Sequence, residues 1–370
     1  MHTKIHSMVY RAIGLMSGSS LDGLDIAFAE FEEIRGQWSF QILHAETIDY
    51  SDDWRQRLSD AAQLPAYDFV KLDNDFGRYT GEAVNNFIEK NGLQHRVQII
   101  ASHGHTIFHE PEKYITTQIG NAAQIAALTN INVVSDLRSL DVALGGQGAP
   151  IVPLGEKFLF KDFSYFLNIG GIANLSIKNE DESFTTFDVC IANQTLNYFA
   201  KPAGKPFDEN GNLARNGNIN TTLLTQLNAL DYYKSNSPKS LSNQYFGENI
   251  LPIIRQNNLS NEDVLRTFTE HIALQIGNAL SNKADTTTQQ LLVTGGGAFN
   301  TFLIEKIKAN LASYNFEVVL PEKNIIEFKE ALIMAFIGVM RWREENTVLS
   351  GATGASRPGI GGAVWIGQEY

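Results

Sequence analysis

The sequence predicts an α/β protein of two domains, and three observations carry this prediction. The chain has 370 residues, which exceeds the usual size of one domain. Two separate stretches each contain three closely spaced strand-like segments rich in β-branched and aromatic residues. In each stretch, helical segments follow the strands, and glycine-rich turns stand at strand ends. Two such halves predict a repeated architecture with a cleft between them.

The first half opens with three predicted strands and continues with helices. The strands are expected at residues 9–16, 24–31 and 38–48. Hydrophobic periodicity then predicts helices at 52–62 and 66–90, a buried strand at 97–102, a helix at 122–128 and a strand at 131–135. The glycine-rich stretch 143–150 marks the expected end of this half.

The second half repeats this order. Its three strands are expected at residues 165–169, 173–178 and 184–189. Ser260 and Asp263 resemble a capping box that opens a long helix to about residue 282. A strand at 290–294 leads into three glycines and a helix at 299–313, and the apolar run 331–340 is predicted to be a buried helix.

Composition and charge exclude several classes of protein. Hydrophobic residues make up 43% of the chain and charged residues 19%, which indicates a globular protein. The net charge of −12 argues against a large basic surface for nucleic acid or anionic lipid. A single cysteine, Cys190, excludes an intrachain disulfide framework and fits a reducing, cytoplasmic setting. No signal-peptide core or membrane-spanning run is found.

A first candidate site is the segment GLMSGSSLDGLD, residues 14–25, between two predicted strands. Its small residues allow consecutive backbone amides to surround a phosphate. The segment lacks the Lys of a P-loop and precedes a strand, so an ordinary Gly/Ser hairpin is the alternative. Asp22 and Asp25 are candidates for a hydrated magnesium ion or a hydroxylated ligand, although Asp22 alternatively stabilises the turn.

A second candidate is the segment SHGHTIFH, residues 102–109. His103, His105 and His109 share one face if this segment is extended, which is a possible zinc pattern without a nearby cysteine. Polar contacts to a ligand, or histidines on the surface, are the preferred interpretations.

Three further charged residues stand close to strand ends or a helix start. Arg138 follows a predicted strand and is suited to bind a carboxylate, with an internal Arg–Asp ion pair as the alternative. Asp188 is a candidate general base or magnesium neighbour, or else a turn residue. Glu330 begins a helix, where the helix dipole favours a carboxylate in any case. The glycines after the strand at 290–294 favour a nucleotide site.

Together these segments resemble the anhydro-N-acetylmuramic acid kinases, a bacterial cell-wall recycling family of the actin, sugar-kinase and Hsp70 superfamily. The resemblance runs nearly end to end. The matching stretches are GLMSGSSLDGLD, ASHGHTIFHEP, TQIGNAAQIAALTNINVVSDLRSLDVALGGQGAPIVP, FLNIGGIANLSI, KPFDENG, LLVTGGGAFN, KEALIMAF and TGASR.

The resemblance implies a two-lobed, actin-like (RNase H-like) fold. Each lobe is expected to hold a mixed sheet with helices, and ATP is expected in the cleft between lobes. We expect the N-terminal lobe to comprise residues 1–137 and about 341–370, and the C-terminal lobe residues 138–340. ATP with Mg²⁺ is the implied cofactor pair, the anhydrosugar is the implied substrate, and a homodimer in the bacterial cytoplasm is the implied state.

The resemblance also assigns roles to individual residues. Asp188 matches the family's catalytic base and Glu330 an acidic position near the sugar. The expected substrate-binding residues are His103, Thr106, Arg138 and Gly148. The expected ATP-binding or phosphate-binding residues are Gly18, Ser19, Ser20, Leu21, Asp22, Gly23, Leu24, Asp25, Gly170, Gly171, Asn193, Gly295, Gly296, Gly297 and Asn300. No dedicated metal site is expected, and Mg²⁺ would accompany ATP near Asp22 and Asp188.

Several positions depart from the family pattern. Where the family usually has Asp-Thr-Gly-Pro-Gly-Asn, residues 188–193 read Asp-Val-Cys-Ile-Ala-Asn, so both glycines are lost. The segment 238–244 loses an Arg and a Glu, Leu140 replaces an Arg, and His105 stands where Gln is usual. Cys190 beside the base is either a reactive thiol or, as preferred, a small buried apolar residue.

These departures leave three hypotheses open. The first is an active anhydrosugar kinase that opens the 1,6-anhydro bridge with water and phosphorylates O6. The second is a catalytically weak relative that binds nucleotide or sugar. The third is a kinase with a changed sugar, because the loss of a basic residue at Leu140 removes a potential contact to the lactyl carboxylate.

Overall fold

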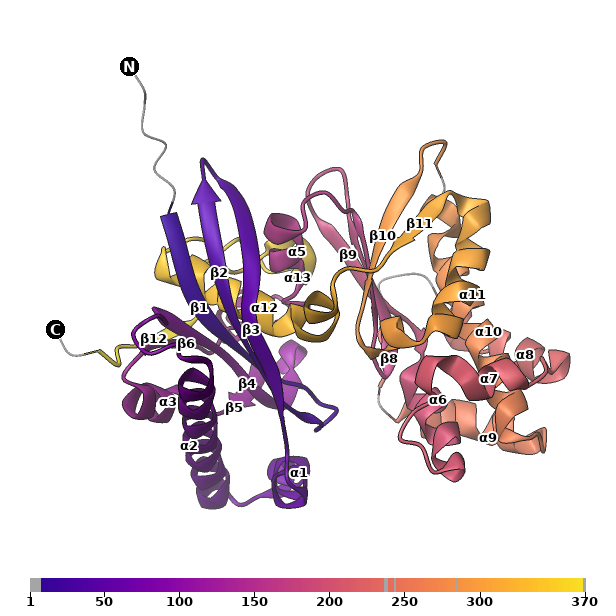
Figure 1. The fold of residues 1–370 in the computed structure, drawn as a ribbon, viewed down its shortest axis with the longest axis horizontal. Coiled ribbons are helices and arrows are strands. Elements are labelled where there is room, and N and C mark those ends of the chain that lie inside the picture. The colour runs from indigo at the N-terminus through magenta and orange to yellow at the C-terminus, as the bar shows by residue number, and fades with distance from the viewer. Residues whose placement is uncertain (1–7, 236–238, 243, 284, 369–370) are drawn as a thin grey trace. The chain divides into compact units, whose positions relative to one another are not determined.

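A computed structural model describes residues 8–235, 239–242, 244–283 and 285–368, and its contacts divide the chain into two compact units. The first unit extends to Lys161 and resumes at Phe328, and the second runs from Asp162 to Glu327. Each unit contains one β-sheet with helices packed on it (Figure 1). The predicted α/β class is therefore confirmed.

The first unit has a sheet with the strand order β12-β6-β4-β1-β2-β3, and β5 pairs with β4. Its strands are β1 (Met8–Ser17), β2 (Gly23–Ile34), β3 (Gln37–Asp49), β4 (Ile99–Glu110), β5 (Ile115–Ile119), β6 (Asn132–Ser135) and β12 (Ala363–Trp365). β1, β2 and β3 form an antiparallel meander, whereas β4 and β6 run parallel to β1. Its helices are α1 (Asp52–Ser59), α2 (Ala66–Asn91), α3 (Ala122–Thr129), α4 (Ser139–Ala143), α5 (Pro153–Leu159) and α13 (Ser350–Thr353).

The second unit repeats this strand order in a five-stranded sheet, β11-β10-β7-β8-β9. Its strands are β7 (Tyr165–Ile169), β8 (Ile172–Lys178), β9 (Phe184–Ile191), β10 (Gln289–Thr294) and β11 (Phe316–Val319). β7, β8 and β9 form the antiparallel meander, and β10 and β11 run parallel to β7. Its helices are α6 (Asn193–Ala200), α7 (Asn212–Asn216), α8 (Thr221–Asn228), α9 (Leu251–Gln256), α10 (Asn261–Leu280) and α11 (Thr301–Leu311).

Local sequence signals explain where the main helices begin and end. Ser260 caps α10 by accepting a hydrogen bond from the amide of Asp263, which confirms the predicted cap. Gly92 ends α2 in the left-handed conformation that glycine adopts without steric cost. The last long helix, α12 (Lys323–Trp342), has a non-helical residue at Phe328, where the chain passes into the first unit. Within the described residues, no helix combines the length and the apolar character that a membrane crossing requires.

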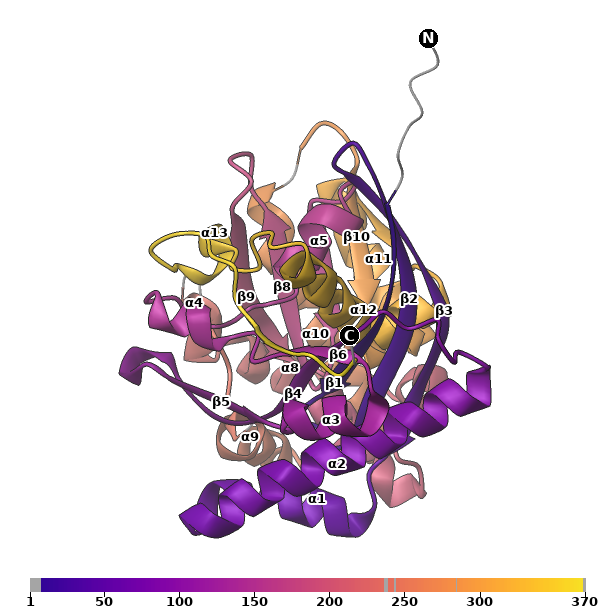
Figure 2. The same cartoon turned by 90° about the vertical axis from the view of Figure 1, so that its left-hand side faces the viewer.

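The two faces of the first sheet are covered by different helices. Ile13 and Leu15 belong to a core that includes residues of α2 and α3. Figure 2 shows these two helices side by side. Gly14, between Ile13 and Leu15 on β1, faces α12 on the other side. A Cβ atom at Gly14 would lie 1.8 Å from the carbonyl oxygen of Ala331 and 2.6 Å from the amide nitrogen of Ala335. The absence of a side chain at Gly14 therefore lets α12 pack directly on the strand.

The compact units divide at 161/162 and 327/328, which differs from the expected boundaries at 137/138 and about 340/341. Segments on either side of the observed boundaries explain the difference. α5 packs on β3, and the ring of Phe160 lies 5.2 Å from that of Phe40. Gly155 lies against Ile333, so α5 also packs on α12. These contacts retain 138–161 and 328–340 in the first unit.

We expect Gly14→Ala to destabilise the protein by about 3 kcal/mol or more, because backbone atoms of α12 occupy the space of the added methyl group. Urea unfolding followed by circular dichroism measures this change. The control is Gly247→Ala, because no atom lies within 4 Å of a Cβ there and its φ is not positive. Equal stability of the two variants would contradict the packing described for β1 and α12.

Candidate active site

The segment expected to bind phosphate forms the turn between β1 and β2. Leu21 has a positive φ of 59°, and its amide donates to the carbonyl oxygen of Gly18 at 3.3 Å. Ser19 and Ser20 are exposed on this turn. A Cβ at Gly23 would lie 2.6 Å from the carbonyl oxygen of Ile48, so glycine is required where β2 meets β3. The turn is thus a tight hairpin with exposed hydroxyls. This shape fits a phosphate-binding turn as well as an ordinary Gly/Ser hairpin, which are the two interpretations of the sequence.

The two carboxylates of this turn have different surroundings. Asp22 is exposed, whereas Asp25 is partly buried and accepts a hydrogen bond from the Thr47 hydroxyl at 2.6 Å. Asp22 therefore keeps its carboxylate available to solvent and ions, and Asp25 connects β2 to β3.

Three of the four expected substrate-binding residues form one hydrogen-bonded group in the first unit. Arg138 donates from Nε to Nε2 of His103 at 2.8 Å and from Nη1 to the carbonyl oxygen of Gly148 at 2.7 Å. His103 also bonds through Nδ1 to the carbonyl oxygen of Gly104 at 2.9 Å. Burial, helped by the positive charge of Arg138, lowers the pKa of His103 to about 3, so this imidazole is neutral. His103 therefore accepts from Arg138 and donates to Gly104.

Arg138 keeps its charge in this group. Burial lowers its pKa to about 10, and the negative charges of Glu330 and Asp141 oppose this shift. Asp141 accepts hydrogen bonds from the amide of Gly148 at 2.6 Å and from the Thr353 hydroxyl at 2.5 Å. Asp141 thereby holds the loop that carries Gly148. Arg138 and Asp141 are therefore connected through Gly148, in place of the direct ion pair that was the alternative.

Thr106, the fourth expected substrate-binding residue, lies further along β4. Its hydroxyl accepts from Nε2 of Gln118 at 3.3 Å. Gln118 and His103 both line a pocket of about 290 Å³ in this unit. Its other lining residues include Asp136, Ser139 and Thr116.

The three histidines of 102–109 do not converge. Gly104 has a positive φ of 74° and breaks the regular alternation of the strand. His103 therefore bonds to Arg138, His105 to Ser17 and His109 to Thr116. Among the described residues, no group of three His, Cys, Asp or Glu side chains is placed to hold a metal ion.

Glu330 is partly buried in α12 beside a buried ion pair. Nζ of the neighbouring Lys329 lies 2.9 Å from Oε1 of Glu156, and these side chains are 5% and 2% exposed. Burial raises the pKa of Glu330, whereas the charges of Lys329 and Arg138 lower it. No local sequence pattern predicts this pair, because Glu156 and Lys329 lie 173 positions apart.

In the second unit, Asp188 lies on the edge strand β9, and a neighbouring segment fixes it. Its Oδ2 accepts from the amide of Leu241 at 2.8 Å, and its own amide donates to the carbonyl oxygen of Lys239 at 3.0 Å. The Tyr232 hydroxyl donates to the carbonyl oxygen of Asp188 at 2.6 Å. Burial raises the pKa of Asp188, opposed by the bond from Leu241. A partly buried carboxylate of raised pKa is suited to accept a proton.

The Gly170–Gly171 turn joins β7 to β8 and is bonded to the start of α6. The amide of Ala192 donates to the carbonyl oxygen of Gly171 at 2.8 Å, and that of Asn193 donates to Gly170 at 3.1 Å. Nδ2 of Asn193 donates to the carbonyl oxygen of Ile169 at 3.1 Å. Gly170, Gly171 and Asn193 therefore form one group at the carboxyl end of β7, where ligands of open α/β sheets usually bind.

The three glycines after β10 reach the same end of this sheet. Gly295 has a φ of 82°, and a Cβ there would lie 2.5 Å from Oδ1 of Asn168. A Cβ at Gly297 would lie 2.2 Å from Cγ2 of Ile169. Only glycines allow this close approach between the two turns. Asn300, by contrast, caps α11, with its Oδ1 accepting from the amide of Leu303 at 3.0 Å, so its side chain has a structural role.

The departures at Cys190 and Ala192 are accommodated without strain from positive φ. Neither residue has a positive φ, and both are fully buried in the core of the second unit. Leu140 lies against Gly359 and Gly361 of the C-terminal segment. Pro238 and Asn243 of the altered segment 238–244 lie outside the described residues.

Cys190 is a core residue rather than a reactive thiol. Its side chain is fully buried, and burial raises its thiol pKa, with the nearby Asp188 acting in the same direction. We expect the native protein to release no thionitrobenzoate from Ellman's reagent, and the denatured protein to release one equivalent per chain. Rapid labelling of the native protein would contradict this description of the site.

A repeated sheet order, with glycine turns at the carboxyl ends of parallel strands in each unit, is typical of α/β proteins that bind a ligand at these strand ends. A profile of the anhydro-N-acetylmuramic acid kinase family matches residues 10–367. The chain belongs to this family.

Individual relatives agree in length with the chain. It is 33% identical to the anhydro-N-acetylmuramic acid kinase of Sulfurimonas denitrificans, over 95% of this chain and 98% of that protein. It is 30% identical to the kinase of the same name from Haemophilus influenzae, over 95% and 97% of the two chains. Among solved structures, the activator of the 2-hydroxyisocaproyl-CoA dehydratase from Clostridium difficile matches 90% of this chain and 96% of its own, with 16% identity and a TM-score of 0.44.

Proposed function

We propose that this protein uses ATP and water to convert 1,6-anhydro-N-acetylmuramic acid into N-acetylmuramic acid 6-phosphate and ADP, a step of cell-wall recycling. The observation that carries this proposal is the retained carboxylate of Asp188. It stands on β9 of a chain that matches the kinase family over almost its whole length, and the Leu241 amide fixes one of its oxygens.

The proposed chemistry assigns one proton transfer to Asp188. Its carboxylate takes a proton from the water that attacks C1 of the sugar. The bond between C1 and O6 breaks, its electron pair goes to O6, and O6 attacks the γ-phosphorus of ATP while ADP leaves. One base therefore activates water, and ring opening creates the second nucleophile. Phosphoryl transfer then depends mainly on positioning and on charge stabilisation.

ATP would be held by backbone amides rather than by a basic surface. The turn at 18–25 and the glycine turns at 170–171 and 295–297 contain small residues, which would let phosphate oxygens approach the backbone closely. Mg²⁺ bound with ATP would reduce the negative charge of the phosphates. The exposed carboxylate of Asp22 fits a hydrated magnesium ion, and the expected positions near Asp22 and Asp188 stay predictions.

The sugar would be bound by the hydrogen-bonded group of Arg138, His103 and Gly148. His103 and the Gly148 carbonyl hold the guanidinium, and Glu330 contributes a negative charge that acts on it. We propose a supporting role for Glu330 beside the sugar. Thr106 is proposed as a further polar contact on the same strand as His103.

A second candidate function is a kinase of the same chemistry that acts on an anhydrosugar without a lactyl carboxylate. Leu140 favours this candidate, because it stands where the family has an arginine. Its apolar side chain lies against Gly359 and Gly361 and cannot bind a carboxylate. Comparing turnover of anhydrosugars with and without the lactyl group separates the two candidates.

The deciding experiment measures ADP release from MgATP after addition of 1,6-anhydro-N-acetylmuramic acid, with mass detection of the sugar product. A product heavier by one phosphoryl group (HPO3) and one water supports the proposal. A folded protein that binds ATP and forms no such product from either sugar would instead support a role in binding only. We also propose that the protein is a homodimer in the bacterial cytoplasm. Sedimentation of the purified protein tests the oligomeric state.

A further inference from the structure

Three buried polar side chains of the first unit form a chain of hydrogen bonds below the β1–β2 turn. The Tyr50 hydroxyl donates to Oγ of Ser17 at 2.6 Å, and Oγ of Ser17 lies 2.8 Å from Nδ1 of His105. Their side chains come from β1, from the residue after β3 and from β4. Ser17, Tyr50 and His105 are only 3%, 1% and 4% exposed, so none of these bonds competes freely with water.

The direction of the hydrogen bond from Tyr50 to Ser17 determines which groups donate in the rest of this hydrogen-bonded series. Oγ of Ser17 accepts the Tyr50 proton, and its own proton then has Nδ1 of His105 as its acceptor. With Nδ1 as this acceptor, the neutral ring of His105 carries its proton on Nε2. Burial lowers the pKa of His105 to about 4, which keeps the ring neutral and Nδ1 available as an acceptor near neutral pH.

Tyr50 also binds the turn directly. Its amide donates to the carbonyl oxygen of Asp22 at 3.1 Å. The hydroxyl of the same residue reaches Ser17, which is the last residue of β1 before Gly18. Tyr50 therefore holds both sides of the turn, one through its backbone and the other through its side chain.

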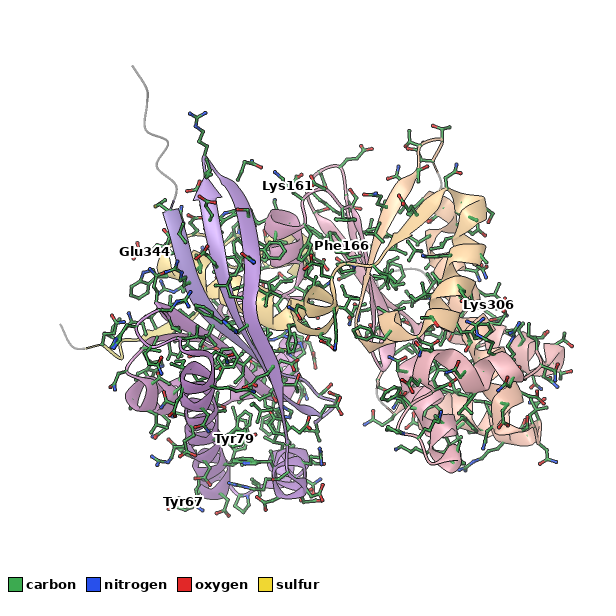
Figure 3. All side chains as sticks on the ribbon, viewed as in Figure 1. Tyr67, Tyr79, Lys161, Phe166, Lys306 and Glu344 are labelled. Carbon is green, nitrogen blue, oxygen red and sulfur yellow. The ribbon has the colours of Figure 1, made fainter. Side chains whose placement is uncertain are left out.

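Aromatic rings surround the hydrogen-bonded side chains of Tyr50 and His105 and hold Tyr50 in place. The ring of Phe76 lies 6.1 Å from Tyr50 and 6.3 Å from His105, and the ring of Tyr79 lies 6.0 Å from Tyr50. Phe76 and Tyr79 both belong to α2, and Figure 3 labels Tyr79 on this helix. Because the surroundings are apolar, a hydroxyl without its partner would cost more here than at the surface.

We propose that Tyr50, Ser17 and neutral His105 are positioning residues that hold the turn at 18–25 in the shape that binds the phosphates of ATP. None of the three touches the reacting atoms. They act through the backbone of Gly18 to Asp22, a stretch whose exposed residues Ser19, Ser20 and Asp22 would meet the ligand. This inference rests on the proposed function in one respect, which is that the turn binds the phosphates of MgATP.

The test measures binding of the magnesium complex of a non-hydrolysable ATP analogue by calorimetry, together with the KM values for MgATP and the anhydrosugar. Tyr50→Phe removes only the hydroxyl. His105→Asn keeps an acceptor at the position of Nδ1, whereas His105→Leu has a similar size and no acceptor. We expect Tyr50→Phe and His105→Leu to weaken analogue binding about tenfold, and His105→Asn to stay within about threefold of the wild type.

The control is His271→Leu in the second unit. His271 is also fully buried, and it bonds through Nδ1 to Asn228 at 2.7 Å and through Nε2 to the Tyr233 hydroxyl at 2.9 Å. Its loss should lower the melting temperature and leave analogue binding within about twofold. The KM for MgATP should rise in Tyr50→Phe and His105→Leu, while the KM for the sugar stays within about twofold.

The outcomes separate this inference from the proposed function. Equal weakening in His105→Asn and His105→Leu, or unchanged analogue binding in both Tyr50→Phe and His105→Leu, overturns the inference even if the enzyme phosphorylates the sugar. A wild type that binds the analogue and yields no sugar phosphate overturns the proposed function. The binding series still decides the inference in that case, because it needs no turnover.

Discussion

Asp188→Asn will lower sugar-dependent ADP release by about a thousandfold and leave binding of MgATP within about twofold. An amide cannot accept the proton of the attacking water, and a general base commonly contributes between about a hundredfold and ten-thousandfold to a rate. Asn has the same shape and still offers an oxygen to the Leu241 amide, so the strand and its neighbouring segment should be retained. The coupled assay measures the rate, and calorimetry with a non-hydrolysable analogue measures binding.

Asp181→Asn is the matched control for this substitution. Asp181 is exposed in the turn between β8 and β9, where its carboxylate bonds to Ser183. The same change of charge in the same unit should leave turnover within about twofold. If Asp188→Asn retained wild-type turnover, the proton would have to be accepted by another group, and the role proposed for Asp188 would be wrong.

The repeated order of strands could be predicted from sequence because each meander has a clear apolar pattern. The segments 9–16, 165–169 and 290–294 lie within β1, β7 and β10, and their alternation or continuous burial decides them. β5 was missed, because the strand predicted at 97–102 continues to Glu110 and the chain turns back there. The histidines that suggested a ligand cluster belong to this extension, where Gly104 redirects them.

The candidate site was predictable where glycine spacing carries the signal, and unpredictable where distant side chains meet. Gly295 and Gly297 stand out in the sequence, and the structure explains them by their contact with Asn168 and Ile169. By contrast, the bond between Tyr50 and Ser17 joins residues 33 positions apart, and Lys329 meets Glu156 across 173 positions. No local pattern encodes such pairs, because each side chain is ordinary in its own segment.

Lys329→Met will destabilise the protein by about 3–5 kcal/mol, because it leaves the buried carboxylate of Glu156 without its ammonium partner. Urea unfolding should show the loss directly. Glu156→Gln removes the other half of the same pair and should also destabilise the protein. The double variant should recover part of the loss, because neither buried charge then remains without its partner. Full stability of Lys329→Met would show that this ion pair contributes nothing.

The two single substitutions differ in their effect on Glu330, and this difference tests the role of that residue. Burial raises the pKa of Glu330, the positive charge of Lys329 lowers it, and the negative charge of Glu156 raises it. Lys329→Met should therefore raise the pKa of Glu330 further, whereas Glu156→Gln should lower it. If Glu330 acts as a carboxylate, the acid limb of kcat/KM moves to higher pH in the first variant and to lower pH in the second. Loss of stability alone would leave the acid limb unchanged in both variants, or would shift it in the same direction in both. Opposite shifts would therefore assign the effect to the charge of Glu330.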